Sequence, residues 1–289
     1  MSFSEQRLTV GQCATLACLW EATAPKVGNV NRCADFADTT LYDFVTSAVA
    51  IGRVLDRAGE QTFGDTVLEC IEGTRRLVKA NTNLGIVLLL TPLAMSPSDQ
   101  PFQETLPRIL ANLDSEDCAK TYRAIQLANP GGLGSVAAGD IHAPPPADLL
   151  SAMKLAEHRD RIAYQYSHNF VDVFDKVLPW LLDSIDQGQG LIDAIIHTQL
   201  RLMNEIPDSL IARKCGNAIA QQASQRASLV LKSAVGSQAY MNGLADLDFW
   251  LRSDANRRNP GTTADLLTAG LFLALRYELI KAPFEFMPR

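Results

Sequence analysis

The sequence predicts an all-α fold, a single compact multi-helix bundle domain over residues 1–289 with two buried central helices. Apolar residues recur with helical spacing in nearly every segment, and the alternating β-branched runs that predict strands are almost absent. Two segments, residues 84–93 and 266–275, contain no charged residue. Because a helix without a polar face is enclosed by other helices, we expect these two at the centre.

Apolar residues three or four positions apart predict the other helices in order along the chain. They cover residues 8–22, 41–55, 63–80, 149–174 (as one long or two shorter helices), 191–206, 216–232 and 238–252. Gly- and Pro-rich sequence at 129–134 and 143–146 predicts a long loop in the middle of the chain. Asp140 and His142 in this loop are a candidate acid–base pair.

The composition, with 47% hydrophobic and 20% charged residues, is typical of a compact globular protein and excludes a disordered one. The net charge of −6 argues against a nucleic-acid partner, which requires a basic face, but leaves an anionic small ligand open. The six cysteines lack C-x-x-C spacing, no apolar secretory segment precedes them, and the longest apolar run, 84–95, is too short to span a membrane. We therefore expect a soluble, cytoplasmic protein with free thiols and no membrane partner.

The most informative segment is the polar turn at residues 25–40, which separates the first two predicted helices. It contains Lys26, Asn29, Arg32, Asp35 and Asp38. Chemistry at a phosphate uses this mixture, with cations for the phosphoryl oxygens, carboxylates for a divalent metal and a glycine for close backbone approach. A solvated loop is the alternative, because turns commonly collect Pro, Gly, Asn and Asp.

A second polar turn lies directly before the first central helix and consists of Asn81, Thr82 and Asn83, followed by Leu84 and Gly85. Side chains of Asn and Thr cap the free N–H groups of a helix, and the same N–H groups can bind an anion. Three consecutive polar residues exceed what a single cap needs, so we interpret this turn as a candidate anion site.

A third polar turn begins at Asp208, which is predicted to cap a short helix with Arg213 and Lys214 in its last turn. That order of charges complements the helix dipole, and stability alone can explain it. It also brings two cations to one helix end, where a phosphate group could bind.

The fourth polar turn precedes the second central helix. Thr262 and Asp265 have the spacing of a capping box, which predicts that the helix starts between them. Just before them, Arg257 and Arg258 offer a fork of N–H donors for phosphate oxygens beside that helix start.

Taken in order, these turns resemble the triphosphoribosyl-dephospho-CoA synthase family. The match includes residues 21–28 (EATAPKVG), like E-x-x-x-P-K-P-G, and 81–85 (NTNLG), like N-T-x-x-G. It continues with Asp208 and Ser209, in place of a D-T pair, and with 259–267 (NPGTTADLL), like S-P-G-G-S-A-D-L-L. The resemblance spans most of the chain.

The resemblance implies an all-α, Mg²⁺-dependent pentosyltransferase that moves the triphosphoribosyl group of ATP to 3'-dephospho-CoA and releases adenine. The product is the prosthetic-group precursor of citrate lyase and malonate decarboxylase. Under this hypothesis the catalytic and metal-binding carboxylates are Asp35, Asp38 and Asp208. Substrate contacts come from Lys26, Asn29, Arg32, Asn81, Thr82, Asn83, Arg213, Lys214, Arg258, Thr262 and Asp265. Assembly as a homodimer is left open.

Two departures from the family pattern leave the acceptor substrate open. The family's G-A-H-x-D-M region is CADFAD at 33–38, and its N-T-H-K-G is NTNLG at 81–85, so a His and a His–Lys pair are missing. These features resemble a divergent branch found in archaea and in bacteria with methanopterin-linked one-carbon metabolism. The alternatives are a related phosphoribosyl or nucleotide transfer in tetrahydromethanopterin-type cofactor biosynthesis, a non-catalytic nucleotide-binding helical module, or capped turns in an interaction bundle.

Overall fold

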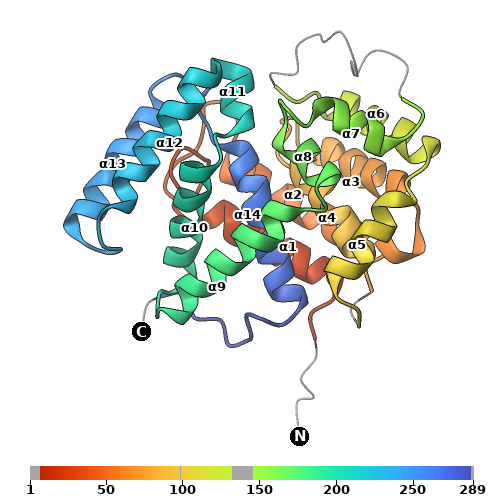
Figure 1. The fold of residues 1–289 in the computed structure, drawn as a ribbon, viewed down its shortest axis with the longest axis horizontal. Helices are drawn as coiled ribbons and strands as arrows, with labels where there is room; N and C mark the ends of the chain where they lie inside the picture. Colours follow the sequence, from red (N-terminus) through yellow and green to blue (C-terminus); the bar gives the residue numbers. More distant parts are fainter. Residues whose placement is uncertain (1–6, 98, 132–145, 288–289) are drawn as a thin grey trace, which may run out of the picture.

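The computed structural model describes residues 7–97, 99–131 and 146–287, and within these ranges it contains α-helices, two short helical turns and no strand (Figure 1). The first elements are α1 (Val10–Thr23), α2 (Leu41–Leu55), η1 (Ala58–Glu60), α3 (Phe63–Leu77), α4 (Leu84–Met95), α5 (Phe102–Ala111), α6 (Ser115–Ala128) and α7 (Leu149–Ala156). They are followed by α8 (Arg161–Ser167), the π-turn η2 (Val173–Val177), α9 (Leu178–Asp186), α10 (Leu191–Glu205), α11 (Ser209–Cys215), α12 (Asn217–Leu231), α13 (Gln238–Arg252) and α14 (Gly261–Arg276). The all-α prediction is confirmed, while Asp140 and His142 lie outside the described residues.

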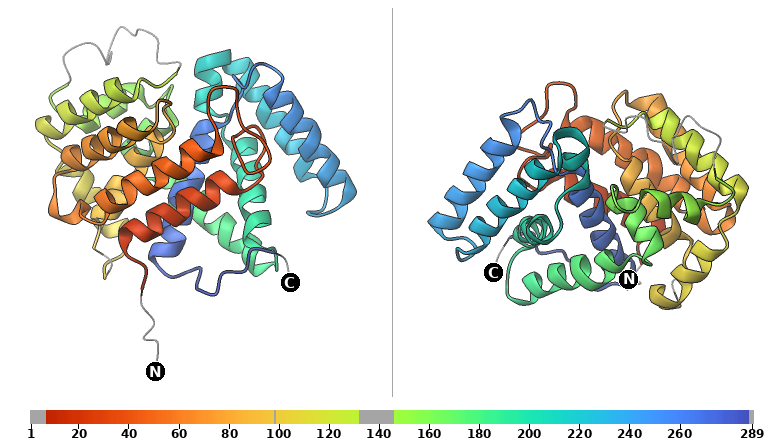
Figure 2. Two further views of the ribbon diagram at one scale, coloured as in Figure 1. Left: turned by 180° about the vertical axis from the view of Figure 1, so that it is seen from behind. Right: turned by 45° about the horizontal axis from the view of Figure 1, so that its top comes forward.

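The two charge-free helices are central, as predicted. Every residue of α14 from Leu266 to Leu275 is buried, and α14 packs against α1, α4, α9 and α10. In α4 the buried run extends from Ile86 to Ala94. Figure 2 shows from two further sides that α14 passes through the middle of the bundle.

Two hydrophobic cores lie on either side of this centre. The larger core joins α1–α10 to α14, and the smaller one is built by the other face of α10 and α11–α13 together with Val27. In Figure 1 the paired helices α12 and α13 form one flank, and α3, α5, α6 and α7 form the other. Segments of the polar turns lie between these flanks, which is where a ligand could contact both.

The sequence did not predict α5, α6 and α9, and it joined elements that the structure separates. The 149–174 segment consists of α7, α8 and the start of η2. Asp160 breaks it first by capping α8 with hydrogen bonds from the backbone N–H groups of Ile162 and Ala163. Asn169 and Phe170 break it again, because both adopt positive φ angles of 49° and 60° that a helix does not tolerate. Among the described residues no helix is both long and apolar enough to span a bilayer.

Candidate active site

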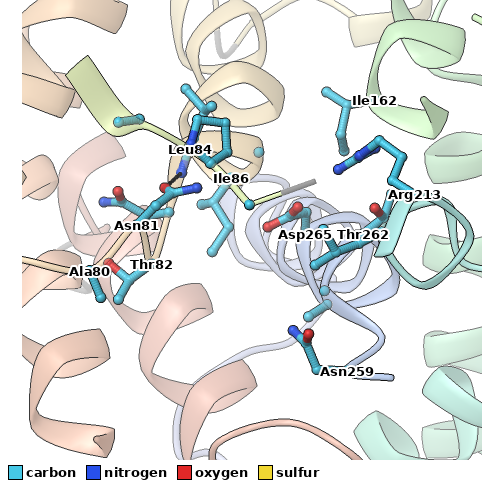
Figure 3. Close-up of a pocket in the computed structure, with 18 of the residues that line it drawn as sticks. Ala80, Asn81, Thr82, Leu84, Ile86, Ile162, Arg213, Asn259, Thr262 and Asp265 are labelled. Carbon is cyan, nitrogen blue, oxygen red and sulfur yellow. Dashed lines mark hydrogen bonds between the residues drawn. The ribbon is translucent and has the colours of Figure 1, made fainter. Parts of the chain in front are cut away.

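The polar turns meet around one pocket of about 920 Å³. Its lining includes parts of the segments 29–39, 79–85, 210–214 and 255–265. In Figure 3, Asn81 and Thr82 lie on one side and Arg213 on the other, with Asp265 between them and Asn259 below. The structure therefore brings together four turns that are far apart in the sequence.

Asp265 is the carboxylate at the centre of this pocket. It projects from the second turn of α14, and no described residue donates a hydrogen bond to it or forms an ion pair with it. Gly85 at the start of α4 packs directly against it, because a Cβ atom at position 85 would lie 2.1 Å from its Oδ2. A glycine is required at position 85 for this close approach.

The surroundings of Asp265 favour its protonated form. Burial raises its pKa well above the usual range, and the negative charges of Glu21, Asp208 and Asp160 raise it further. Arg213 lowers it by less. A carboxyl group in a pocket with a raised pKa is a candidate general acid.

Glu21 also lines the pocket, and its carboxylate forms an ion pair with Lys26. The Lys26 ammonium lies 3.0 Å from Glu21 Oε1 and also donates to the Glu21 backbone carbonyl. The Lys26 side chain is fully buried and does not line the pocket. Burial raises the pKa of Glu21, and Lys26 offsets part of that shift. The structure therefore gives Lys26 a charge-balancing place behind the pocket instead of the predicted phosphate contact.

Arg213 and Lys214 reach the pocket from α11, as the sequence suggested. Arg213 Nη1 lies 2.7 Å from Asp160 Oδ2, and Lys214 Nζ donates to Asn259 Oδ1 at 3.0 Å. Burial lowers the pKa of Lys214, and the charge of Asp208 offsets part of this effect. The remaining cationic residues that line the pocket are Arg75, Lys79, Arg159 and Arg257.

Asp208 does not line the pocket, so its position does not fit the predicted catalytic role. It is buried, and it accepts hydrogen bonds from the backbone N–H groups of Leu210 at 2.9 Å, Ile211 at 3.0 Å and Thr263 at 2.7 Å. It therefore caps α11, which confirms that part of the prediction, and it also holds the start of α14. Burial raises its pKa, whereas these hydrogen bonds and Arg213 lower it in part.

The proposed metal carboxylates do not converge. Asp38 lines the pocket, whereas Asp35 is exposed outside it and accepts a hydrogen bond from Leu41 N at 2.7 Å. Asp208 lines only a small separate cavity. Within the described ranges no group of three or more His, Cys, Asp or Glu side chains could hold a metal ion. The set of Asp35, Asp38 and Asp208 is thus not assembled as one metal site.

The predicted capping box at the start of α14 is wrong. The helix begins at Gly261, so Thr262 and Asp265 both lie inside it and no side chain caps its N-terminus in the manner of a box. The Thr262 hydroxyl is instead 2.9 Å from the Ser209 hydroxyl. Asp265 therefore does not cap the helix, and its carboxyl group faces the pocket.

The predicted amide and hydroxyl residues all line the pocket, and their hydrogen bonds fix its walls. Asn29 Oδ1 accepts from Gln199 at 2.9 Å, and Asn81 Oδ1 accepts from Leu84 N at 3.2 Å. The Thr82 hydroxyl lies 2.6 Å from that of Ser47, and Asn83 Nδ2 donates to Thr74 at 2.9 Å.

Besides Lys26, two further predicted cations lie outside the pocket. Arg258 stacks on Trp250 with 4.6 Å between the guanidinium carbon and the ring centroid, and it donates to the Trp250 carbonyl at 3.0 Å. Arg32 is exposed in the loop before α2 and does not line the pocket. The phosphate contacts predicted for these two residues are not supported by their positions.

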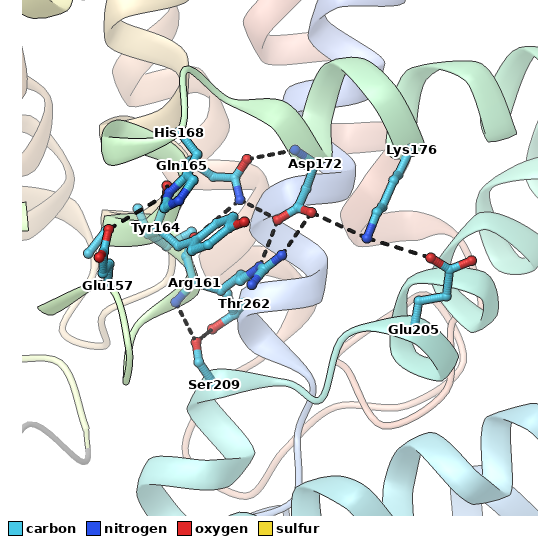
Figure 4. Close-up of polar contacts among 12 residues, drawn as sticks. Glu157, Arg161, Tyr164, Gln165, His168, Asp172, Lys176, Glu205, Ser209 and Thr262 are labelled. Carbon is cyan, nitrogen blue, oxygen red and sulfur yellow. Dashed lines mark hydrogen bonds and ion pairs between the residues drawn. The ribbon is translucent and has the colours of Figure 1, made fainter. Parts of the chain in front are cut away.

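A polar network behind the pocket fixes the wall that carries Thr262 (Figure 4). Arg161 donates to Asp172 through Nε at 2.7 Å and Nη2 at 2.9 Å, and Gln165 donates to the same carboxylate at 2.5 Å. The Arg161 backbone N–H donates to Ser209 Oγ at 3.1 Å, and Ser209 in turn bonds to Thr262. The network therefore joins the start of α8 to α11 and α14.

Comparison with known proteins decides the family. A family model for the ATP:dephospho-CoA triphosphoribosyl transferases matches residues 7–283. The chain belongs to this family. Members of the triphosphoribosyl transferase family use ATP and dephospho-CoA as substrates. This chain is therefore a transferase whose substrates are small-molecule nucleotides.

A solved structure has the same fold as this triphosphoribosyl transferase. It is a crystal structure from Archaeoglobus fulgidus named as a candidate triphosphoribosyl-dephospho-CoA synthase, and it is 24% identical with a TM-score of 0.62. The match covers 80% of this chain and 97% of that chain, which at this identity shows the fold. No curated protein matches the chain.

Sequence reasoning about this transferase missed several charged residues of the pocket. Glu21 opens the segment that carries the family resemblance, so its place in that motif was a signal. Asp160, Arg75 and Arg159 stand in ordinary helical patterns or at helix ends. No local signal separates them from surface charges, because only the packing of α3, α8 and α11 brings them to the pocket.

Proposed function

We propose that this chain transfers the triphosphoribosyl group of ATP to the 2'-hydroxyl of 3'-dephospho-CoA and releases adenine, with the reaction centred on Asp265. The observation that carries this proposal is a half-buried carboxyl group with a raised pKa and no hydrogen-bond partner among the described residues, in a pocket that also holds cations from four parts of the chain. A transfer of this kind needs a proton donor for the leaving base and positive charge for the triphosphate.

In this proposal Asp265 is the proton donor to the leaving adenine. The bond between adenine and ribose C1' breaks with its electron pair moving to the base, and the protonated Asp265 carboxyl donates to a ring nitrogen of adenine. The acceptor oxygen forms the new bond to C1' and its proton returns to the Asp265 carboxylate, so the reaction consumes no net proton.

Arg213 and Lys214 are proposed to hold the triphosphate. Both line the pocket beside Asp265, and Lys214 is only partly balanced by its neutral partner Asn259. Charge-assisted hydrogen bonds to phosphate oxygens are about twice as strong as neutral ones. These contacts fix the ribose at the distance where its C1' faces Asp265 and the acceptor.

A Mg²⁺ ion is proposed to accompany the triphosphate. Mg²⁺ in phosphate sites is commonly bound by one or two carboxylates plus the substrate phosphates and water. Asp38 fits this need, because it lines the pocket, is exposed, and is close enough to Lys214 to affect its pKa. The ion would supply charge neutralisation on the phosphate chain.

Adenine release tests the proposal. The protein is incubated with ATP, Mg²⁺ and dephospho-CoA, adenine is measured by chromatography, and the conjugate is weighed by mass spectrometry. We expect adenine and the conjugate in equal amounts, and neither when dephospho-CoA is omitted. No adenine under these conditions contradicts the proposal, and adenine formed only with a pterin precursor favours transfer in methanopterin-type biosynthesis.

For assembly and location we propose a cytoplasmic homodimer. Tyr42 and Val49 are exposed and lie two turns apart on one face of α2, which offers an apolar contact for a second copy. All six cysteines are free, in agreement with a reducing compartment. Light scattering that gives the mass of a monomer at micromolar concentration contradicts the dimer.

A further inference from the structure

The pocket has one wall of a different character from the rest. Helices α6, α7 and the start of α8 contribute the apolar side chains Ile125, Ala128, Leu149, Ala152, Met153 and Ile162. We call this wall the apolar lobe. The cations and carboxylates of the pocket come from the surrounding segments instead, so one continuous pocket has a charged part and an apolar part.

The two parts match two kinds of substrate chemistry. The volume of about 920 Å³ is near the upper end of the range of about 300–1,000 Å³ for ligand pockets, as expected where two substrates bind together. ATP carries a tetra-anionic chain, a sugar and a flat base. Dephospho-CoA shares the sugar and the base, but in place of the third phosphate it carries a long uncharged pantetheine arm with a branched hydrocarbon centre. This arm is the piece of either substrate that gains most from an apolar wall.

The side chains of the lobe also favour a flexible arm. Ala128 and Ala152 are small, and they line the pocket from α6 and α7. Met153 beside them is an unbranched side chain that adapts to a flexible ligand.

We propose that the apolar lobe binds the pantetheine arm of the acceptor and thereby selects dephospho-CoA over nucleotides that lack the arm. This inference rests on the proposed function. It adds a specificity element that the charged residues do not provide, because ADP carries the same adenosine and pyrophosphate as dephospho-CoA.

The test fills the lobe. Ala152→Trp places a large side chain in the lobe, and Leu155→Trp adds the same residue to the exposed side of the same helix as the control. We expect Ala152→Trp to raise KM for dephospho-CoA at least tenfold, with KM for ATP changed less than twofold. The Leu155→Trp variant should keep both values. A rise in KM for ATP alone places the donor base in the lobe and overturns the inference, as does no change in either KM.

A second measurement does not depend on the folding of a variant. The wild-type protein is assayed with ADP as a truncated acceptor, and triphosphoribosyl-ADP is detected by mass. We expect kcat/KM at least 100-fold lower than with dephospho-CoA, and equal values overturn the inference. If the wild type releases no adenine with dephospho-CoA, the proposed function itself has failed, which is a distinct result.

Discussion

Asp172 is buried and Asp265 is half-buried at the pocket, and the hydrogen-bond surroundings of the two carboxyl groups are opposite. Asp172 receives two hydrogen bonds from Arg161 and one from Gln165, and Lys176 lies 3.6 Å away. Burial alone would raise its pKa, yet these partners outweigh burial and the pKa is lowered. Asp265 receives no such contact from the described residues, and its pKa is raised well above the usual range.

The difference separates a structural carboxylate from a reactive one. A buried carboxylate with a full set of donors stays ionised and ties helices together. A carboxyl group that lines a pocket without donors holds its proton up to a higher pH and remains free to pass it to a ligand. Asp265 lies on α14, and the network around Asp172 fixes the start of the same helix through Arg161, Ser209 and Thr262.

The largest effect is expected from Asp265→Asn. Asparagine has the same shape but cannot donate an acidic proton, so we expect adenine release to fall by about 10²- to 10⁴-fold. Steady-state adenine formation with ATP and dephospho-CoA measures the loss. Activity within twofold of wild type would remove Asp265 from the chemistry.

A substitution of Asp172, in contrast, should lower the free energy of unfolding and leave catalysis largely unchanged. Asp172→Ala leaves the Arg161 guanidinium without its partner. Because the Arg161 side chain is one quarter exposed, we expect the loss of its charged hydrogen bonds to cost about 1.5–3 kcal/mol. Urea denaturation measures the loss in the free energy of unfolding. Below the transition kcat should stay within a few-fold of wild type, and a stability unchanged by the substitution contradicts the structural role.

The contact between Gly85 and Asp265 provides a finer test. A methyl group at position 85 overlaps the Asp265 carboxylate, whereas at Gly73 the nearest atom to an added Cβ is 3.9 Å away. We expect Gly85→Ala to lower kcat roughly tenfold or more by displacing Asp265, given how steeply rates depend on placement. The matched control Gly73→Ala should keep kcat and gain roughly 0.5–1 kcal/mol of stability. Equal activities of the two variants argue against a fixed position for Asp265.

The phosphate contacts proposed for the cations of the pocket can be tested with a matched pair of variants. Lys214→Met should raise KM for ATP roughly 10- to 100-fold, which corresponds to the loss of one charged hydrogen bond of about 1.5–3 kcal/mol. Arg258→Met should leave KM unchanged, because Arg258 stacks on Trp250 outside the pocket. If Arg258→Met has the larger effect, the phosphate contacts have been assigned to the wrong side.

A smaller effect concerns pH and stability. A raised pKa in the folded state means that the free energy of unfolding falls as pH rises from the unfolded-state pKa, about 3.9, toward the folded-state pKa. Asp265→Asn removes this loss, so the variant should melt at a higher temperature than wild type at pH 8. Scanning calorimetry at pH 5 and pH 8 measures the difference, and a variant less stable than wild type at pH 8 contradicts the raised pKa.

The sequence predicted the two central helices because a run without charge has one physical explanation in a bundle. It also predicted that Asp208 caps a short helix, since caps depend on near neighbours. The pairing of Lys26 with Glu21 and of Arg213 with Asp160 could not be predicted, because each depends on how helices pack. The helix α6 was missed since its apolar residues are few, although Asp114 and Asp117 at its start form a capping box.

Infrared spectroscopy of the Asp265 carboxyl group tests the central claim most directly. A protonated carboxyl has a carbonyl stretch that an ionised one lacks, and the wild-type minus Asp265→Asn difference spectrum at pH 7 isolates it from Glu21 and Asp208. We predict that this band is present in the wild type, lost in the variant, and lost in the wild type as pH is raised. A difference spectrum without the band at pH 7 shows an ionised Asp265 and contradicts its role as the proton donor.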